Sequence, residues 1–321
     1  MARHAARIKR EGNTSEEIVR SKIWYDDGSV ILQAESNLCR VHWTVLAQHS
    51  SFFSDMRAVP QPLDDPLIEG CPIIQLSDSI QDLEHLLRAL YNPLFDAAET
   101  LDFPVVAAIV RLGKKYEFTQ LLSAAVARLT AMFPPTLAQI QGRLDGSDRI
   151  REDGGLLFDA INLASETGLD TLLPSLYFDT LNVLGKDGLD QVMTGMVRND
   201  QTTAKLSFES QITLVRCQKV VTEAQAKMMF GWLDPNEFPT QACCDLKKCD
   251  WTRNVVVDGI FSPLYTLRTM HKWYDCWDED MFCAKCLKVA KSKFEEGSEE
   301  FWDTLPEYFE LPGWDELQND I

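Results

Sequence analysis

The stretch VILQAESNLCRVHWTVLAQHSSFFSDM, residues 30–56, changes its hydrophobic period in the middle, and this change predicts how the fold begins. Val30, Leu32 and Ala34 occupy every second position, which is typical of a half-buried strand. A Ser36-Asn37 turn lets residues 38–41 pair back as a second strand. The following residues form a stripe spaced by three and four positions, which predicts an amphipathic helix. The stripe comprises Val45, Leu46, His49, Phe52, Phe53 and Met56.

The sequence after this stretch extends the prediction to a whole domain. Residues 71–76 have the composition of a short strand, and the serines and aspartate that follow supply N-cap groups to a helix over residues 80–91. Pro104 fits the first turn of another helix, and a partner helix ends at Pro134-Pro135. We therefore expect an α+β domain over residues 21–135, with a small three-stranded sheet capped by helices.

The two ends of the chain differ from this domain. Residues 1–20 are polar and are expected to be a disordered tail. Residues 136–321 have helical spacing and no strand pattern, so we expect a mostly α-helical C-terminal region there. Its acidic final segment contains several aromatic residues, which favours a tail docked on the body. The predicted helices of this region cover residues 156–167, 169–184, 208–233 and 255–273.

Composition and charge exclude several classes of protein. With 49 acidic and 31 basic residues the net charge is −18, so binding to nucleic acid or to anionic membranes is not expected. No apolar run approaches the ~20 residues of a membrane-spanning helix. The start of the chain has no apolar core of a secretory signal. Nine cysteines without such a signal favour an intracellular, reducing compartment, and the sequence does not distinguish cytoplasm from nucleus.

Three stretches of the first domain carry a family resemblance. They are residues 30–56, IIQLSDSIQDLEHLLRALYNP (residues 73–93) and FPVVAAIVRLGKKYEFTQLLSAAVARL (residues 103–129). Together they resemble the BTB/POZ domain, in particular the divergent BTB proteins of mushroom-forming fungi. The ending FWDTLPEYFELPGWDEL, residues 301–317, also looks like the C-terminal signature of these fungal proteins. The resemblance implies a fold used for homo- or hetero-association, and many members of the family recruit cullin-based ubiquitin ligases.

The resemblance also assigns roles to single residues. His42 matches the family's buried histidine after the second strand, and Tyr91 matches the aromatic residue that ends the next conserved helix pattern. Ser29 and Trp43 stand where the family often has an aspartate and a basic residue that form a charged pocket. Trp43 is thus expected to be an exposed aromatic residue, a type common among interface anchors. The expected motif and interaction residues are Val30, Leu32, His42, Trp43, Leu46, Phe53, Met56, Tyr91 and Tyr116.

The cysteines of the C-terminal half are the constellation with chemical content. Cys283 and Cys286 form a C-x-x-C pair, a spacing that can place two thiolates on one Zn²⁺. A second pair can come from the cysteines around residue 245, with His271 or Cys276 as substitutes. The alternative interpretation is that the C-x-x-C residues are ordinary buried thiols on one helix face. The predicted ligands of a structural zinc are Cys244, Cys249, Cys283 and Cys286.

No pattern in the sequence indicates catalysis. Phosphate-loop, dinucleotide, serine-hydrolase and zincin motifs are absent from the chain. Cys39 and His42 lie close in sequence, but a strand end followed by a helix start does not fix the geometry of a nucleophile and its base. We therefore expect no enzyme activity.

These observations together predict a non-enzymatic adaptor that acts by binding other proteins. Its expected partners are proteins, including a second copy of itself or a cullin if it serves as a substrate adaptor of a ubiquitin ligase. Two alternatives remain at this stage. One is a zinc-stabilised binding module in the C-terminal half. The other is a transcriptional regulator, because some BTB proteins carry DNA-binding modules, although the acidic charge argues against direct contact with DNA.

Overall fold

The computed structural model describes residues 18–59, 67–92, 100–143, 150–151, 153–184, 188–261, 267–273, 277 and 280–321. The fold is mixed α/β and divides into two compact units. The sheet unit comprises the chain up to Arg128 together with Arg149–Arg151, and the helical unit comprises the remainder. The division falls inside helix α5 (Thr119–Met132), a few residues before the predicted boundary at 135.

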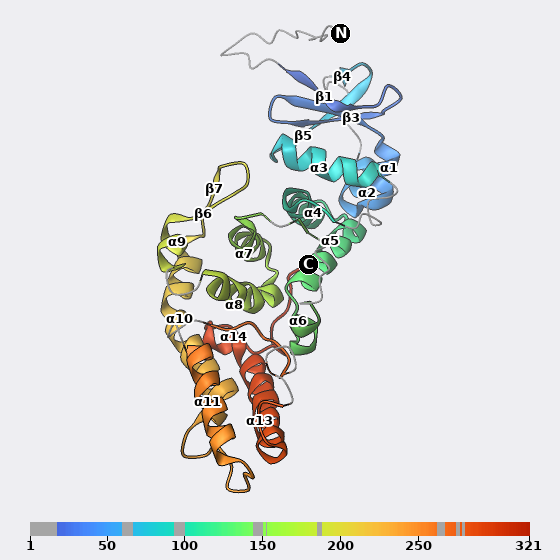
Figure 1. The fold of residues 1–321 in the computed structure, drawn as a ribbon. Coiled ribbons are helices and arrows are strands. Elements are labelled where there is room, and N and C mark those ends of the chain that lie inside the picture. The colour runs from blue at the N-terminus through green and yellow to red at the C-terminus, as the bar shows by residue number, and fades with distance from the viewer. Residues whose placement is uncertain are drawn as a thin grey trace. The chain divides into compact units, whose positions relative to one another are not determined.

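The sheet unit contains a five-stranded mixed sheet (Figure 1). Its strands lie in the order β1-β3-β2-β5-β4, where β2 and β3 form the predicted antiparallel hairpin and β5 lies parallel to β2. Two edge strands were not predicted, and β1 begins within the predicted tail, of which residues 1–17 lie outside the described residues. The strands are β1 (Val19–Trp24), β2 (Val30–Ala34), β3 (Asn37–Val41), β4 (Leu67–Ile68) and β5 (Cys71–Leu76).

The central strand β2 is buried on both faces. Val30, Ile31 and Leu32 are at most 1% exposed. On one face, Ile31 packs with Leu38 and Cys71. The alternating pattern predicted a strand that is buried on one face, whereas β2 is buried on both. A central strand with both faces covered needs apolar residues at consecutive positions.

A serine divides the helix predicted after the hairpin into two. Ser50 has an extended backbone between α1 (Trp43–His49) and α2 (Ser51–Ala58). Its hydroxyl accepts a hydrogen bond from Phe53 N at 3.0 Å and donates one to Tyr116 O at 2.5 Å. Ser50 thus caps α2 and ties it to the end of α4. The other helices of the unit are α3 (Ile80–Tyr91), α4 (Phe103–Lys115) and the first part of α5.

The helical unit is built around the long pair α10 and α13. The predicted helix over residues 255–273 is wrong at both ends, because α11 begins at Leu246 and ends at Phe261. The elements of the helical unit are α6 (Leu137–Arg143), α7 (Leu156–Thr167), η1 (Asp170–Leu172), α8 (Leu173–Leu184), α9 (Gly188–Thr194), the short strands β6 (Met196–Val197) and β7 (Thr203–Ala204), α10 (Phe208–Phe230), η3 (Gly231–Leu233), α11 (Leu246–Phe261), α13 (Ala284–Asp303) and α14 (Leu305–Tyr308).

The acidic C-terminal segment places its aromatic side chains against the body of the helical unit. The rings of Trp302 and Trp314 stack at 5.9 Å, and Trp314 Nε1 donates to Trp302 O at 2.8 Å. Phe309 is 2% exposed and packs on Tyr177. Among the described residues, no helix combines the length and the apolar character that crossing a bilayer demands.

Candidate metal centre

Two helix starts bring cysteines together in the helical unit. Asp245 begins α11: its carboxylate accepts from Lys248 N at 3.1 Å, and its carbonyl accepts from Cys249 N at 3.0 Å. Cys283 is the N-cap residue of α13, so that Cys286 lies in the first turn of that helix. The sequence thus places a thiol at the start of each helix, and at α11 the Asp245 cap holds the backbone.

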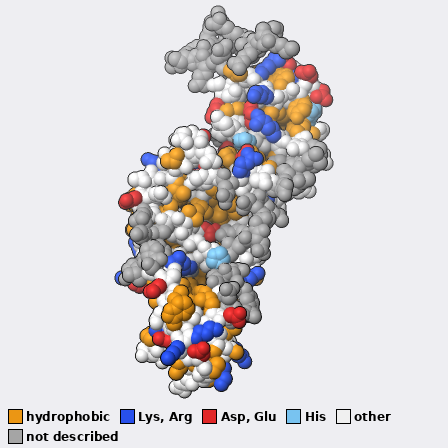
Figure 2. Space-filling view, viewed as in Figure 1, with side chains coloured by type: hydrophobic (Ala, Val, Ile, Leu, Met, Phe, Trp, Pro, Cys, Tyr) orange, Lys and Arg blue, Asp and Glu red, His pale blue; other side chains and the backbone are white. Residues whose placement is uncertain are grey.

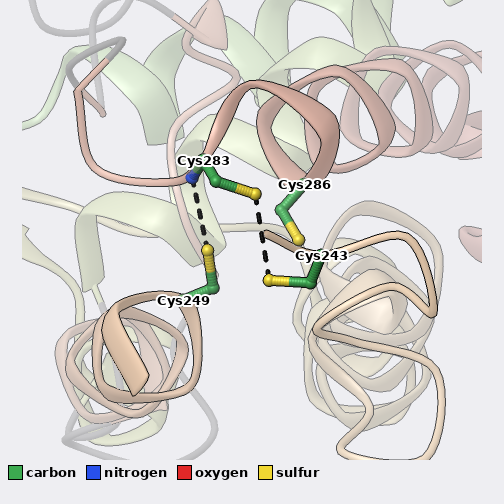
Figure 3. A group of neighbouring side chains, drawn as sticks. All are labelled: Cys243, Cys249, Cys283 and Cys286. Carbon is green, nitrogen blue, oxygen red and sulfur yellow. Dashed lines mark hydrogen bonds between the residues drawn. The ribbon is translucent and has the colours of Figure 1, made fainter. Parts of the chain in front are cut away.

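The four-cysteine cluster consists of Cys243, Cys249, Cys283 and Cys286, whose thiols point toward a common centre (Figure 3). All four Sγ atoms lie within 4.8 Å of one another, and those of Cys243 and Cys283 are 3.8 Å apart. Zn–S bonds of about 2.3 Å in a tetrahedron separate the sulfur atoms by about 3.8 Å. The donor set and the spacing therefore fit a metal ion of this kind with small movements of the side chains.

Hydrogen bonds from the surrounding chain orient the thiols. Cys283 N donates to Cys249 Sγ at 3.2 Å, and Thr240 Oγ1 lies 3.6 Å from Cys286 Sγ. Cys249 and Cys286 are fully buried, whereas Cys243 and Cys283 are partly exposed. Such contacts around a metal site fix the orientation of its ligands and stabilise thiolate charge.

The surroundings shift the pKa values of two thiols of the cluster in opposite directions. Burial raises the pKa of Cys249 to about 12. Burial also acts to raise the pKa of Cys283, but hydrogen bonds from the backbone amides of Cys244 and Cys286 and from neighbouring thiols lower it to about 5. A divalent cation would let all four groups ionise together, because its charge offsets the repulsion among the thiolates.

The structure differs from the predicted ligand set at one position. Cys249, Cys283 and Cys286 meet as expected, but Cys243 supplies the fourth thiol and Cys244 is exposed. The reason is a turn in which Cys243 N donates to Thr240 O at 2.9 Å, which directs the Cys243 side chain inward. Of the two substitutes, His271 lines a separate cavity, and Cys276 lies outside the described residues.

Most of the predicted interaction residues belong to the core of the sheet unit. Trp43 is 8% exposed, which contradicts the prediction of an exposed anchor. Trp43 is the first residue of α1, and its backbone N–H donates to Ser29 Oγ at 3.0 Å. This bond fixes the start of the helix, and the Trp43 ring turns inward. Met56 is half-buried. The residues that are at most 4% exposed are Val30, Leu32, Leu46, Phe53 and Tyr116.

His42 and Tyr91 form a polar contact at the end of the hairpin. The Tyr91 hydroxyl accepts from His42 N at 2.9 Å and lies 3.1 Å from His42 Nδ1. On the other side of the ring, His42 Nε2 lies 3.0 Å from the carboxylate of Asp27, and this hydrogen bond lowers the pKa of Asp27. Burial raises the pKa of Tyr91. His42 therefore joins the hairpin to the end of α3. This contact indicates a structural role for the histidine.

The fold and the cluster together define a two-unit chain with a mixed sheet and a cysteine-rich helical part. No protein-family model matches the chain, and no curated protein matches it. The resemblance to the BTB/POZ domain thus rests on the sequence stretches quoted above and enters the function as a proposal.

Proposed function

We propose that this chain is a non-enzymatic adaptor that binds proteins through a BTB-like sheet unit. The observation that carries the proposal is the open edge of the sheet. In the described part of the chain, β1 has a hydrogen-bonded neighbour, β3, on one side only, and Val19 at its start is 51% exposed. An edge strand offers backbone N–H and C=O groups to a strand of another chain.

β1 carries two positive side chains, Arg20 and Lys22, and the first of them is held in place. Arg20 forms an ion pair with Glu69, and its guanidinium lies 4.3 Å from the centre of the Trp24 ring. The arginine is therefore held along the sheet's own surface. Lys22 is exposed on the same strand, so a partner strand has to accommodate its charge. Self-association through β1 is the first form of the proposal.

The mass of the full chain in solution tests this form. Light scattering is expected to give twice the monomer mass of 36.5 kDa. Val19→Lys places a charge at the edge and is expected to return the chain to the monomer mass. Val183→Lys is the matched control, since Val183 is 64% exposed on α8 of the helical unit. A wild-type chain that remains monomeric at high concentration would contradict self-association.

Recruitment of a cullin is a narrower form of the proposal and comes from the family resemblance alone. Its test is a binding titration of the full chain against the N-terminal domain of a purified cullin. Saturable binding supports this form of the proposal, and the absence of binding at high concentration removes it.

We further propose that the four-cysteine cluster holds a structural zinc ion. Four thiolates complete the tetrahedron of Zn²⁺ and leave no position for a substrate, which is typical of a structural and not a catalytic site. The metal would join the segment before α11 to the start of α13. Its function would be to keep the helical unit folded as a binding module.

Metal analysis of the purified chain tests the zinc proposal. One zinc per chain is expected, and Cys283→Ser is expected to lose it, because three thiolates bind far less tightly than four. Cys217→Ser is the control, since Cys217 is a buried thiol on α10 and not a member of the cluster. A fully folded wild-type chain without metal would overturn the proposal.

A further inference from the structure

The helical unit contains a cavity of about 490 Å³. The four clustered cysteines are not among the residues that line it. Its size lies within the range of about 300–1,000 Å³ that small-molecule sites occupy. Most of its lining is apolar and comes from α10, α11, α13 and the chain between the last two. The apolar lining includes Met229, Val255, Val256, Trp277, Met281 and Phe294.

The polar side chains of the lining all come from one segment, Leu267–Trp273. They are Arg268, Thr269 and His271. The buried side chain of Gln225 holds this segment with two hydrogen bonds of 2.7 Å, one from its amide nitrogen to Arg268 O and one to its amide oxygen from Arg268 N. Asn182 donates to Thr269 Oγ1 at 3.1 Å. The polar groups are therefore fixed before any ligand arrives, which lowers the cost of binding.

Arg268 brings a positive charge to the cavity. Its guanidinium donates to the carbonyl oxygens of Gly259 and Ile260 at the end of α11, where a cation is favoured by the helix dipole. No carboxylate among the described residues forms an ion pair with it. A cation held by backbone carbonyls retains the capacity to bind a carboxylate, and a planar guanidinium matches that group well.

Gly259 borders open space at the cavity. Gly259 lies inside α11 and lines the cavity, and a Cβ added there would meet no atom within 4 Å. Glycine inside a helix costs about 1 kcal/mol relative to alanine, so no packing reason explains it at this position. Val255 and Trp251 continue the same side of the helix at four-residue intervals and are 44% and 68% exposed. Figure 2 shows hydrophobic side chains gathered at the surface over α11.

We propose that this cavity binds a small apolar carboxylic acid. The carboxylate lies against Arg268 at the end of α11, and the apolar part lies among the methionine, phenylalanine and tryptophan side chains. The geometry favours an anion over a cation because, among the described lining residues, Arg268 supplies the fixed charge. The inference is independent of the adaptor function and of the metal.

Calorimetric titration of the full chain with decanoate tests the proposal. Decyltrimethylammonium is the control ligand, since it has the same apolar tail and the opposite charge. We expect decanoate to bind at least about tenfold more tightly, a difference of about 1.4 kcal/mol. Equal affinity for the two amphiphiles, or no binding of decanoate at millimolar concentration, would overturn the proposal.

Variants at Gly259 and Arg268 locate the binding. Gly259→Glu puts a carboxylate at the rim beside Arg268 and is expected to weaken decanoate binding at least about tenfold. Gly259→Ala should leave the affinity unchanged, and Arg268→Lys should retain more binding than Arg268→Gln. Circular dichroism and bound metal confirm that each variant is folded. If Gly259→Glu binds decanoate as the wild type does, the ligand lies elsewhere and the assignment of this cavity is wrong.

Discussion

Cys243 and Cys244 are neighbours in sequence with opposite surroundings. The thiol of Cys243 belongs to the four-cysteine cluster, whereas Cys244 is exposed. Residue types and spacing predicted three of the four clustered thiols correctly. For the fourth they predicted Cys244, whereas the structure has Cys243. The choice depends on the turn from Thr240 to Cys243, a backbone hydrogen bond that the spacing of cysteines does not reveal.

Serine substitutions at the two neighbours should therefore have unequal effects. Cys243→Ser removes a ligand and is expected to lower zinc content and to destabilise the helical unit by about 2 kcal/mol or more. Cys244→Ser should keep both the metal and the stability. Zinc analysis and thermal unfolding of the two variants measure the difference. Equal loss of metal in both would mean that Cys244 also serves as a ligand.

Tyr91→Phe tests the contact at the end of the hairpin. The substitution removes the hydroxyl that accepts from His42 N and bonds to His42 Nδ1. Because both partners are partly buried, we expect a loss of about 1–2 kcal/mol in the free energy of unfolding. Denaturant titration gives this value. Tyr25→Phe is the control, since Tyr25 contacts the same rings by stacking, at 4.6 Å from Tyr91.

At the scale of elements, α10 and α13 approach so closely that a glycine is required between them. A Cβ on Gly297 of α13 would lie 2.0 Å from Met228 O of α10, a backbone atom that has little freedom to move. A Cβ on Gly259 of α11 would have no atom within 4 Å. Close packing therefore requires the glycine in α13, whereas nothing in the packing requires the glycine in α11.

Alanine at these two positions should change stability with opposite sign. Gly297→Ala is expected to cost about 3 kcal/mol because the helices must separate. Gly259→Ala is expected to gain about 0.5–1 kcal/mol from helix propensity. Chemical unfolding of both variants measures the two changes. A stabilising effect of Gly297→Ala would show that the two helices can separate at little cost.

Elements with a local cause were predicted best. The β2–β3 hairpin and α3 follow from alternation, a turn dipeptide and the Ser79 cap, whose hydroxyl accepts from Asp82 N. The edge strand β1 was missed because its charged residues resemble a polar tail, and its place in the sheet depends on pairing with β3. The start of α11 was missed because the Asp245 cap precedes a run of polar residues without a helical stripe.

At the scale of the whole molecule, the division into two units predicts two unfolding transitions. If the cluster holds zinc as proposed, a chelator should lower the midpoint of one transition by about 10 °C, since all four cysteines belong to the helical unit. The other transition should not move. Calorimetry with and without chelator measures both midpoints. A shift of both transitions together would mean that the units unfold as one.

The cysteines of the cluster are far apart in the order of synthesis. Cys243 and Cys249 emerge from the ribosome first, and more than thirty residues follow before Cys283 and Cys286 appear. A metal ion captured early can have only part of its ligands, and it is held firmly only when the second pair arrives. If the cluster holds zinc as proposed, completion of the site is a late step in the maturation of a newly made chain, and a cell poor in zinc would accumulate copies whose helical unit is open to proteases.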